Sequence, residues 1–446
     1  MDGGEEAGRT TGGHAIRPTE RVGRGSRAAS SVAVMSRVLF RGGVVVDGTG
    51  VEPVRADVLV VDGRVAAVGA DVPGAESGGV DPGTQVVDCT GAFVTPGLFD
   101  CHVHFLFEQP TMVQILQTPF SLPFYEAIDR MRRTVATGIT YVRDAGGADL
   151  GLAEAVRRGL VIGPRMQVAI QMISQTGGHG DDWHVCGAQV GLLAGHPGMP
   201  SAVVDGPVEM RRKVRELVRA GADVIKVATS GGVLSPRSNP GHGHLRDDEV
   251  AELVNEASAA GLNVMAHAIA AEGIKTAVRN GVRSIEHGIY LDDEAIELML
   301  EHGTWLVPTL SAPRAVLAQA DAGAPMSDAV VAKARLVAAV HDASVRRAIE
   351  AGVKVAMGTD CGVGVHGSNL EELGHLAALG MPPADVWAAA SGVAAELLGV
   401  EADHGTLEVG KVGDVVVVDG AYDDWTRLRE RVREVWMAGE RVSSRN

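Results

Sequence analysis

Helical and strand patterns alternate along the middle of the chain. A helical pattern at 211–222 runs directly into DVIKVATS at 223–230, whose β-branched residues predict a strand. Alternate side chains of a strand share a face, so Lys226 points to the same side as Val224 and Ala228. A strand that follows a helix in a β/α chain is covered on both faces. The sequence therefore predicts a buried lysine, with a strand-end lysine that reaches water as the alternative.

Eight segments of the middle region have strand character, and a helical pattern follows most of them. They are residues 92–104, 139–146, 165–174, 223–230, 263–268, 284–288, 305–310 and 354–360. Eight such units over about 300 residues predict an α/β fold with a (β/α)8 TIM-type barrel, whose catalytic side chains stand at the C-terminal ends of the strands. Two long segments, 175–207 and 229–247, are where we expect substrate specificity.

Both ends of the chain have short strands and glycine turns. Asp62-Gly63 is a strong hairpin signal between two alternating segments. We therefore predict a small β-sandwich domain formed by residues 35–91 and 405–446, beside a barrel domain at 92–404. Residues 1–34 are rich in Gly, Arg and Ser and have no apolar segment of the kind found in secretory signals. We expect them to be a disordered extension, with Met35 as a possible natural start.

Composition narrows the class of protein. The chain has 446 residues and a net charge of −16, which argues against nucleic acid or an anionic membrane as a partner. Its four cysteines form no CxxC pair and are too few for a disulfide framework, which favours a reducing, cytoplasmic setting. No apolar run approaches the length of a transmembrane helix.

Polar residues that bind metals fall near the ends of the predicted strands. A lone HxH is weak evidence for metal, but here potential ligands stand at the ends of five different strands. The six candidates are His102, His104, Lys226, His267, His287 and Asp360. Their joint placement predicts a metal site at the C-terminal end of the barrel.

At these positions the sequence resembles the amidohydrolase superfamily. Within it, the sequence is most similar to the imidazolonepropionase-like branch, which includes Xaa-Pro dipeptidases, carboxypeptidases, ochratoxin-degrading amidases and phenylurea hydrolases. The resemblance runs from residue 36 to the end and implies a barrel with a small β-sandwich from both termini. The segments that carry it are TPGLFDCHVH (95–104), TGGHGD (176–181), IKVATSGGV (225–233), AHAIAAEGIKTAVRNGVRSIEHG (266–288), GTD (358–360) and GTLEVGKVGDVVVVDG (405–420).

The resemblance also implies roles for the six residues. His102 and His104 match ligands of the more buried metal, and His267 and His287 match ligands of the more exposed one. Lys226 matches a lysine that carbon dioxide converts to a metal-bridging carbamate. The last of the six, Asp360, matches an aspartate that binds metal and shuttles protons.

The chemistry of a buried lysine supports this interpretation. Burial favours the neutral amine, which adds carbon dioxide to give an oxygen ligand that can span two cations. Two divalent metals ~3.5–4 Å apart can hold one hydroxide, whose pKa falls toward ~7. We therefore expect this hydroxide to attack an amide or peptide carbonyl, with Asp360 as general base and then general acid. Zinc fits the ligand set, and manganese or iron fits nearly as well.

Four further residues are candidates for contact with substrate, each with a structural alternative. His179 is a second catalytic candidate, able to hydrogen-bond the carbonyl or a carboxylate, or else to order its loop. Tyr290 follows His287 and either reaches the site or packs on the barrel rim. Arg237 can bind an anionic end of the substrate, and His366 lies on a loop that we expect to face the site.

The substrate stays open at this stage. A dipeptide, an N-acyl amino acid and a xenobiotic amide or urea all fit the predicted chemistry. The rival enzyme is a mononuclear imidazolonepropionase- or deaminase-type hydrolase, against which Lys226 counts because those relatives lack the bridging lysine. A non-catalytic relative would show eroded ligands, whereas all six positions are intact. The resemblance also makes a homo-oligomer possible.

Overall fold

A computed structural model of the protein describes residues 36–70, 72, 83–193, 195–235 and 237–445. The predicted N-terminal extension, residues 1–34, lies outside these described residues. None of the described helices is both long enough and apolar enough to cross a membrane.

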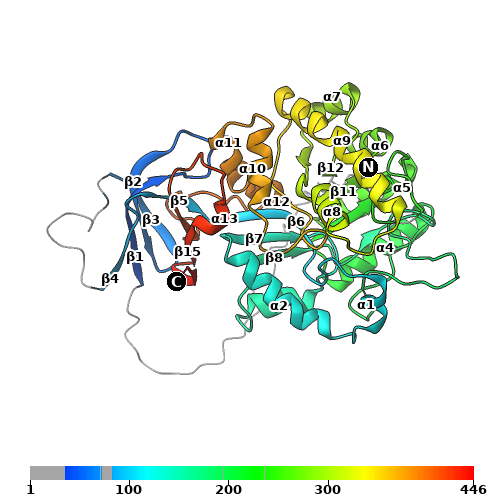
Figure 1. The fold of residues 1–446 in the computed structure, drawn as a ribbon, viewed down its shortest axis with the longest axis horizontal. Coiled ribbons are helices and arrows are strands. Elements are labelled where there is room, and N and C mark those ends of the chain that lie inside the picture. The colour runs from blue at the N-terminus through cyan, green and yellow to red at the C-terminus, as the bar shows by residue number, and fades with distance from the viewer. Residues whose placement is uncertain (1–35, 71, 73–82, 194, 236, 446) are drawn as a thin grey trace, which may run out of the picture. The chain divides into compact units, whose positions relative to one another are not determined.

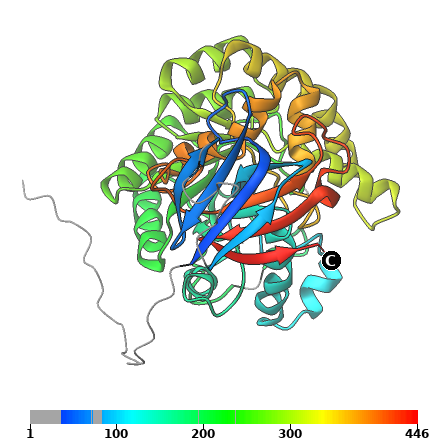
Figure 2. The same ribbon diagram turned by 90° about the vertical axis from the view of Figure 1, so that its left-hand side faces the viewer.

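Strands from both ends of the chain form one eight-stranded sheet. Its order is β16-β15-β14-β5-β1-β2-β3, and β4 pairs with β1 in addition. Figure 2 shows the blue N-terminal strands and the red C-terminal strands side by side in this sheet. The strands are β1 (Arg37–Val45), β2 (Val54–Val61), β3 (Arg64–Gly69), β4 (Thr84–Asp88), β5 (Ala92–Pro96), β14 (Val415–Asp419), β15 (Val432–Met437) and β16 (Glu440–Ser444).

The predicted hairpin at Asp62-Gly63 is confirmed. β2 and β3 pair antiparallel with Val61 opposite Arg64, so the turn has two residues. Its φ angles are 48° at Asp62 and 77° at Gly63, both in the region that this kind of hairpin turn requires.

The middle of the chain forms two parallel sheets. One contains β6 (Leu98–Val103), β7 (Ile139–Asp144) and β8 (Arg165–Val168). The other contains β9 (Met172–Ile173), β10 (Val224–Ala228), β11 (Asn263–Ala268), β12 (Ser284–His287) and β13 (Trp305–Val307). β8 and β9 follow each other closely in the sequence. The strand is interrupted between them near Ile170, where φ is 67°.

Besides 165–174, which divides into β8 and β9, two of the predicted strands differ in the structure. The segment 92–104 divides into β5 and β6, because β5 pairs with β14 of the terminal sheet while β6 pairs with β7. The segment 354–360 is not a regular strand among the described residues. Val355 bridges to Leu306, and Cys361, directly after the segment, bridges to Val103, so this part of the chain lies between β13 and β6.

Helices connect most of the parallel strands (Figure 1). The segment 207–228 shows how a helix leads into a strand. α4 ends at Ala220, Gly221 caps it with φ 95°, and β10 follows. The helices are α1 (Met112–Gln117), α2 (Leu122–Val135), α3 (Leu150–Arg157), α4 (Pro207–Ala220), α5 (Asp247–Ala259), α6 (Ala271–Arg279), α7 (Asp293–His302), α8 (Ser311–Asp321), α9 (Asp328–Ala351), α10 (Glu371–Ala378), α11 (Pro383–Ala389), α12 (Gly392–Leu398) and α13 (Leu428–Arg431).

Both faces of β10 are buried, as its sequence predicts. Ile225 and Val227 belong to the large apolar core that also contains side chains from the surrounding helices. On the opposite face, Val224 packs with residues from the neighbouring strands, including Met265. Lys226 shares that inner face and is only 2% exposed, so the prediction of a buried lysine is confirmed.

The terminal sheet and the central region share an aromatic contact. Phe93 of β5 and Trp387 of α11 are fully buried, and their ring centroids lie 5.2 Å apart in an edge-on arrangement. Such a pair contributes both apolar burial and a favourable ring geometry.

We expect Phe93→Ala to lower the free energy of unfolding by about 3–5 kcal/mol, because it empties a packed site that cannot collapse fully. The measurement is a urea titration followed by circular dichroism. Val113→Ala is the control, since Val113 is 61% exposed on α1 and its truncation should change stability by less than about 0.5 kcal/mol. Equal effects of the two variants would contradict the expected role of this contact.

Candidate active site

Three potential metal ligands converge at the ends of β6 and the 354–360 segment. The ligand atoms of His102, His104 and Asp360 all lie within 4.8 Å of one another. Asp360 Oδ1 lies 3.5 Å from His102 Nε2 and 3.2 Å from His104 Nε2. Burial acts to raise the pKa of the Asp360 carboxyl, but the two histidines and Lys226 outweigh it and lower that pKa. Asp360 is therefore ionised and able to bind a cation.

Lys226 joins this group from β10. Its Nζ lies 3.4 Å from His102 Nε2. Burial lowers the pKa of Lys226 to about 8, although the charges of Glu286 and Asp360 act in the opposite direction. An ammonium group in this position loses hydration, so the neutral amine is a larger fraction here than it is in a lysine exposed to water.

His267 and His287 complete the cluster from β11 and β12. The ring centroid of His287 lies 4.6 Å from that of His267 and 5.2 Å from that of His102. Burial lowers the pKa of all three rings well below the usual value. They are therefore neutral, which is the form that binds metals. The structure thus brings together all six residues predicted as ligands.

Each of the four histidines has one ring nitrogen held by a neighbour, which fixes the direction of the other. The pairs are His102 Nδ1 with Glu286 Oε2 at 2.7 Å, His104 Nδ1 with the Gly146 carbonyl at 2.7 Å, His287 Nδ1 with Thr309 Oγ1 at 2.7 Å, and His267 Nε2 with the Gly231 carbonyl at 3.1 Å. Metal-binding histidines in proteins are held in this way. The nitrogen and oxygen donors, their burial and their fixed orientation therefore fit divalent cations.

The backbone is strained at two of these positions. His287 has φ 74° and Asp360 has φ 59°, conformations that residues other than glycine rarely adopt. Such strain persists only where the surrounding structure holds it, and it concentrates at functional sites.

Sequence reasoning missed the buried ion pair behind His102. Glu286 Oε1 accepts hydrogen bonds from Arg143 at 2.8 Å and from Ser284 Oγ at 2.6 Å, while its other oxygen faces His102. All four side chains are buried. The sequence did contain a signal for this pair, because Glu286 and Arg143 carry opposite charges and lie in two strands that are predicted to be buried.

Asp100 was also missed, and it supports the other side of the site. Its carboxylate accepts hydrogen bonds from Thr359 Oγ1 at 2.6 Å and from Asn369 Nδ2 at 2.8 Å. It also accepts one from the backbone N–H of His102 at 3.1 Å. Asp100 therefore ties the end of β6 to the segment that carries Asp360.

The cluster opens into a cavity of about 330 Å³. His179 lines this cavity, and its ring stacks on His267 with centroids 4.2 Å apart. Burial is the main cause that lowers the pKa of His179 to about 4, so the ring is neutral. Apolar side chains make up much of the remaining wall, among them Phe107, Leu193 and Val337.

The other predicted substrate contacts have different positions. Arg237 is exposed and lies over the ring of Trp183, a cavity residue, at 5.1 Å. Tyr290 does not line the described cavity and packs against the cluster that contains Ile269 and Ile289.

His366 also lies outside the described cavity lining, behind His104. It is fully buried, its Nε2 is 3.0 Å from the His104 carbonyl, and its ring stacks on Phe105 at 5.1 Å. We expected the loop that carries His366 to face the site. It folds back toward β6 instead, and His366 contacts the backbone directly after this strand.

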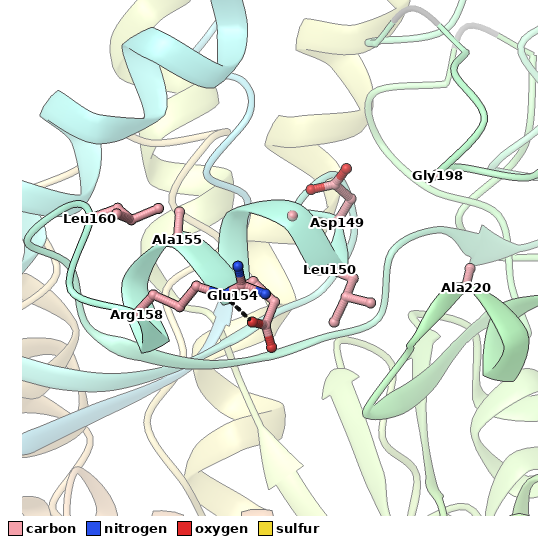
Figure 3. A pocket seen from close by; sticks show the side chains of 9 residues that line it. Asp149, Leu150, Glu154, Ala155, Arg158, Leu160, Gly198 and Ala220 are labelled. Carbon is pink, nitrogen blue, oxygen red and sulfur yellow. Dashed lines mark hydrogen bonds and ion pairs between the residues drawn. The ribbon is translucent and has the colours of Figure 1, made fainter. Parts of the chain in front are cut away.

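Another hollow, of about 530 Å³, lies beside α3 (Figure 3). It is open to solvent, and two of its three charged lining residues, Glu154 and Arg158, pair with each other at 2.8 Å. None of the predicted site residues lines it. Although this hollow is larger than the cavity beside the histidine cluster, it is therefore not the candidate active site.

Parallel strands that present clustered nitrogen and oxygen donors at their ends are the features of a metal-dependent hydrolase. The chain belongs to the amidohydrolase family, which its sequence matches over residues 93–442. It is a hydrolase that acts on C–N bonds.

Individual relatives agree with this family. The sequence is 32% identical to ochratoxinase from Aspergillus niger over 417 residues, which cover 89% of this chain and 85% of that protein. It is 27% identical to imidazolonepropionase from Geobacillus sp. strain WCH70, covering 81% and 83%. A solved Xaa-Pro dipeptidase with methionine bound in its active site matches the structure with a TM-score of 0.82 and 32% identity, covering 91% of this chain and 99% of that one.

Glu286→Gln is expected to weaken metal affinity about 10–100-fold, because it removes the carboxylate that orients His102. Competition with a chromogenic chelator measures this affinity. Glu297→Gln on α7 is the matched control, since Glu297 is exposed to solvent. An unchanged affinity in the first variant would show that the buried carboxylate does not orient a ligand.

Proposed function

We propose that the protein is a binuclear metal-dependent hydrolase that cleaves an amide or peptide C–N bond. The observation that carries the proposal is the position of Lys226, buried and 3.4 Å from His102 among four histidines and Asp360. A buried lysine beside metal ligands has a chemical purpose if it becomes a carbamate that bridges two cations.

The inferred architecture is a closed (β/α)8 barrel over residues 92–404. Hydrogen bonds between the 354–361 segment and Leu306 on one side, and from the Cys101 N–H to the Met357 carbonyl on the other, support closure between β13 and β6. A small β-sandwich domain from 35–91 and 405–446 completes the proposal, with β5 contributed from the start of the barrel segment.

In this proposal His102 and His104 would hold one metal, His267 and His287 would hold a second, and Lys226, as a carbamate, would supply an oxygen ligand to both. Asp360 is a further ligand of the first metal. When bound, two divalent cations, for which zinc suits the donors, supply an activated water and a Lewis acid for the carbonyl oxygen.

The protein's own residues move the proton and orient the substrate. Asp360 is ionised and takes the proton that the attacking water loses. It then delivers this proton to the leaving nitrogen as the C–N bond breaks. His179 faces the same cavity and hydrogen-bonds the substrate's carbonyl oxygen.

The substrate class follows from the cavity and from the relatives. The space is large enough for a small-molecule amide or a dipeptide, and its wall is mainly apolar. Xaa-Pro dipeptides, N-acyl amino acids and xenobiotic amides such as ochratoxins are therefore the substrates that we propose to test.

A mononuclear hydrolase of the imidazolonepropionase type is the second candidate. One observation favours it: in the described part of the chain, only His102, His104 and Asp360 form a ready group of metal-ligand atoms. The similarity to imidazolonepropionase is in line with this candidate. Metal content distinguishes the two proposals.

We expect about two metals per chain in the purified protein and a loss of both metal and hydrolysis in Lys226→Ala, because the variant lacks the bridging ligand. The measurements are elemental analysis and assays with Xaa-Pro dipeptides and N-acyl amino acids. Lys213→Ala on α4 is the control, since Lys213 is a half-buried lysine that pairs with Glu216. One metal per chain, retained in Lys226→Ala, would favour the mononuclear enzyme.

Formation of the carbamate should depend on pH. Nζ attacks carbon dioxide and releases a proton, so only the neutral amine reacts. Because the pKa of Lys226 is lowered to about 8, the neutral fraction rises as pH increases through that value. Between pH 6.5 and 8.5 it should grow on the order of twentyfold.

Reconstitution tests this dependence. Metal-free protein is incubated with zinc and ¹³C-labelled carbon dioxide at equal dissolved concentration, and the carbamate carbon is followed by NMR. A signal that forms faster at pH 8.5, is absent in Lys226→Ala, and precedes activity agrees with the proposal. Equal rates at both pH values would contradict it.

A further inference from the structure

One face of α9 reaches the backbone around the candidate active site. Lys333, Val337, His341 and Ser344 follow one another at intervals of three or four residues and so share this face. Val337 lines the cavity. The other three side chains hydrogen-bond carbonyl groups of the segments that follow β10 and β12.

Lys333 makes three of these hydrogen bonds. Its Nζ donates to the carbonyls of Ser235 at 2.6 Å, Ser238 at 2.9 Å and Gly232 at 3.3 Å. An ammonium group has three N–H donors, so this arrangement uses all of them. Because the donor is charged, the bonds are stronger than those between neutral groups.

The residues that Lys333 holds are in direct contact with His179. Ser235 Oγ lies 3.0 Å from His179 Nδ1. A Cβ at Gly232 would lie 2.2–2.5 Å from atoms of the His179 ring, so only glycine permits this approach. The His179 ring also stacks on that of His267. His179 is thus in close contact with both Gly232 and His267, and the hydrogen bond to Ser235 restricts the rotation of its ring.

The remaining residues of the face act on β12. His341 Nε2 donates to the carbonyl of His287 at 2.9 Å, and Ser344 Oγ donates to the carbonyl of Ile289 at 2.6 Å. The same helix therefore holds the backbone near His267 and His287, the proposed ligands of the second metal. It contacts His287 directly and acts on His267 through the stacked ring of His179.

We propose that Lys333 is a positioning residue that fixes the His179 ring over His267 by holding the carbonyls of Gly232, Ser235 and Ser238. The inference rests on the proposed function, in which His179 binds the substrate's carbonyl oxygen. Lys333 itself is not among the residues that line the described cavity, and the hydrogen bonds described above join it to backbone carbonyls.

The variant Lys333→Met keeps the length of the side chain and removes the donors. We expect it to retain the metal content of the wild type and to lose about 10–100-fold in kcat, since small displacements of a positioned group have effects of this size. Lys213→Met is the matched control, because Lys213 is half-buried in an ion pair on α4. It should behave as the wild type.

A double-mutant cycle separates positioning from general support. If Lys333 acts through His179, adding Lys333→Met to His179→Gln should change kcat less than about twofold, because the two residues serve one function. Losses that multiply in the double variant would overturn the proposal, as would a loss of metal in Lys333→Met.

Hydrogen exchange supplies a measurement that needs no substrate. Backbone amides of residues 177–180 and 231–235 should exchange faster in Lys333→Met than in the wild type and in Lys213→Met. Unchanged exchange would overturn the proposal even if activity fell. If the wild type hydrolyses none of the substrates tested, the proposed function fails, whereas exchange still decides whether Lys333 holds this segment.

Discussion

A buried carboxylate, Glu286, is the group on which the site depends most directly. It is fully buried and bonded to Arg143, Ser284 and His102, and so connects β12 with β7 and β6. An unpaired charge in such a position costs several kcal/mol, so these partners must be present together. The hydrogen bonds of Glu286 therefore fix β12, β7 and β6 relative to one another, and this arrangement orients the His102 ring toward the other proposed ligands.

The electrostatic character of the cluster follows from burial. His102, His267 and His287 stay neutral because the interior disfavours their charged forms, and burial also moves the pKa of Lys226 downward. Asp360 is the exception, since its interactions with the neighbouring histidines, including the hydrogen bond to His104, outweigh burial and lower its pKa. One environment thus prepares neutral nitrogen donors and an anionic oxygen donor, a combination suited to divalent cations.

The outer helices do more than cover the strands. The face of α9 that carries Lys333 bonds to backbone carbonyls of segments with little regular structure. Such segments carry specificity but have few partners of their own, so an outer helix can determine their shape. The strand ends therefore supply the potential metal ligands of the cavity, and α9, which lies far along the chain from β10, supports part of the cavity wall.

The sequence alone determined the alternation of strands and helices, the Asp62-Gly63 hairpin, the burial of Lys226 and the six residues that cluster. These properties follow from local periodicity and from residue types at strand ends, which a single segment displays. Only the tertiary structure decided which groups hold those residues. Glu286 lies 184 positions from His102, and Lys333 lies 98 positions from Ser235, so no local pattern could pair them. It also decided that 354–360 forms isolated bridges instead of a regular strand and that His366 lies behind His104, because both depend on neighbours brought together by folding.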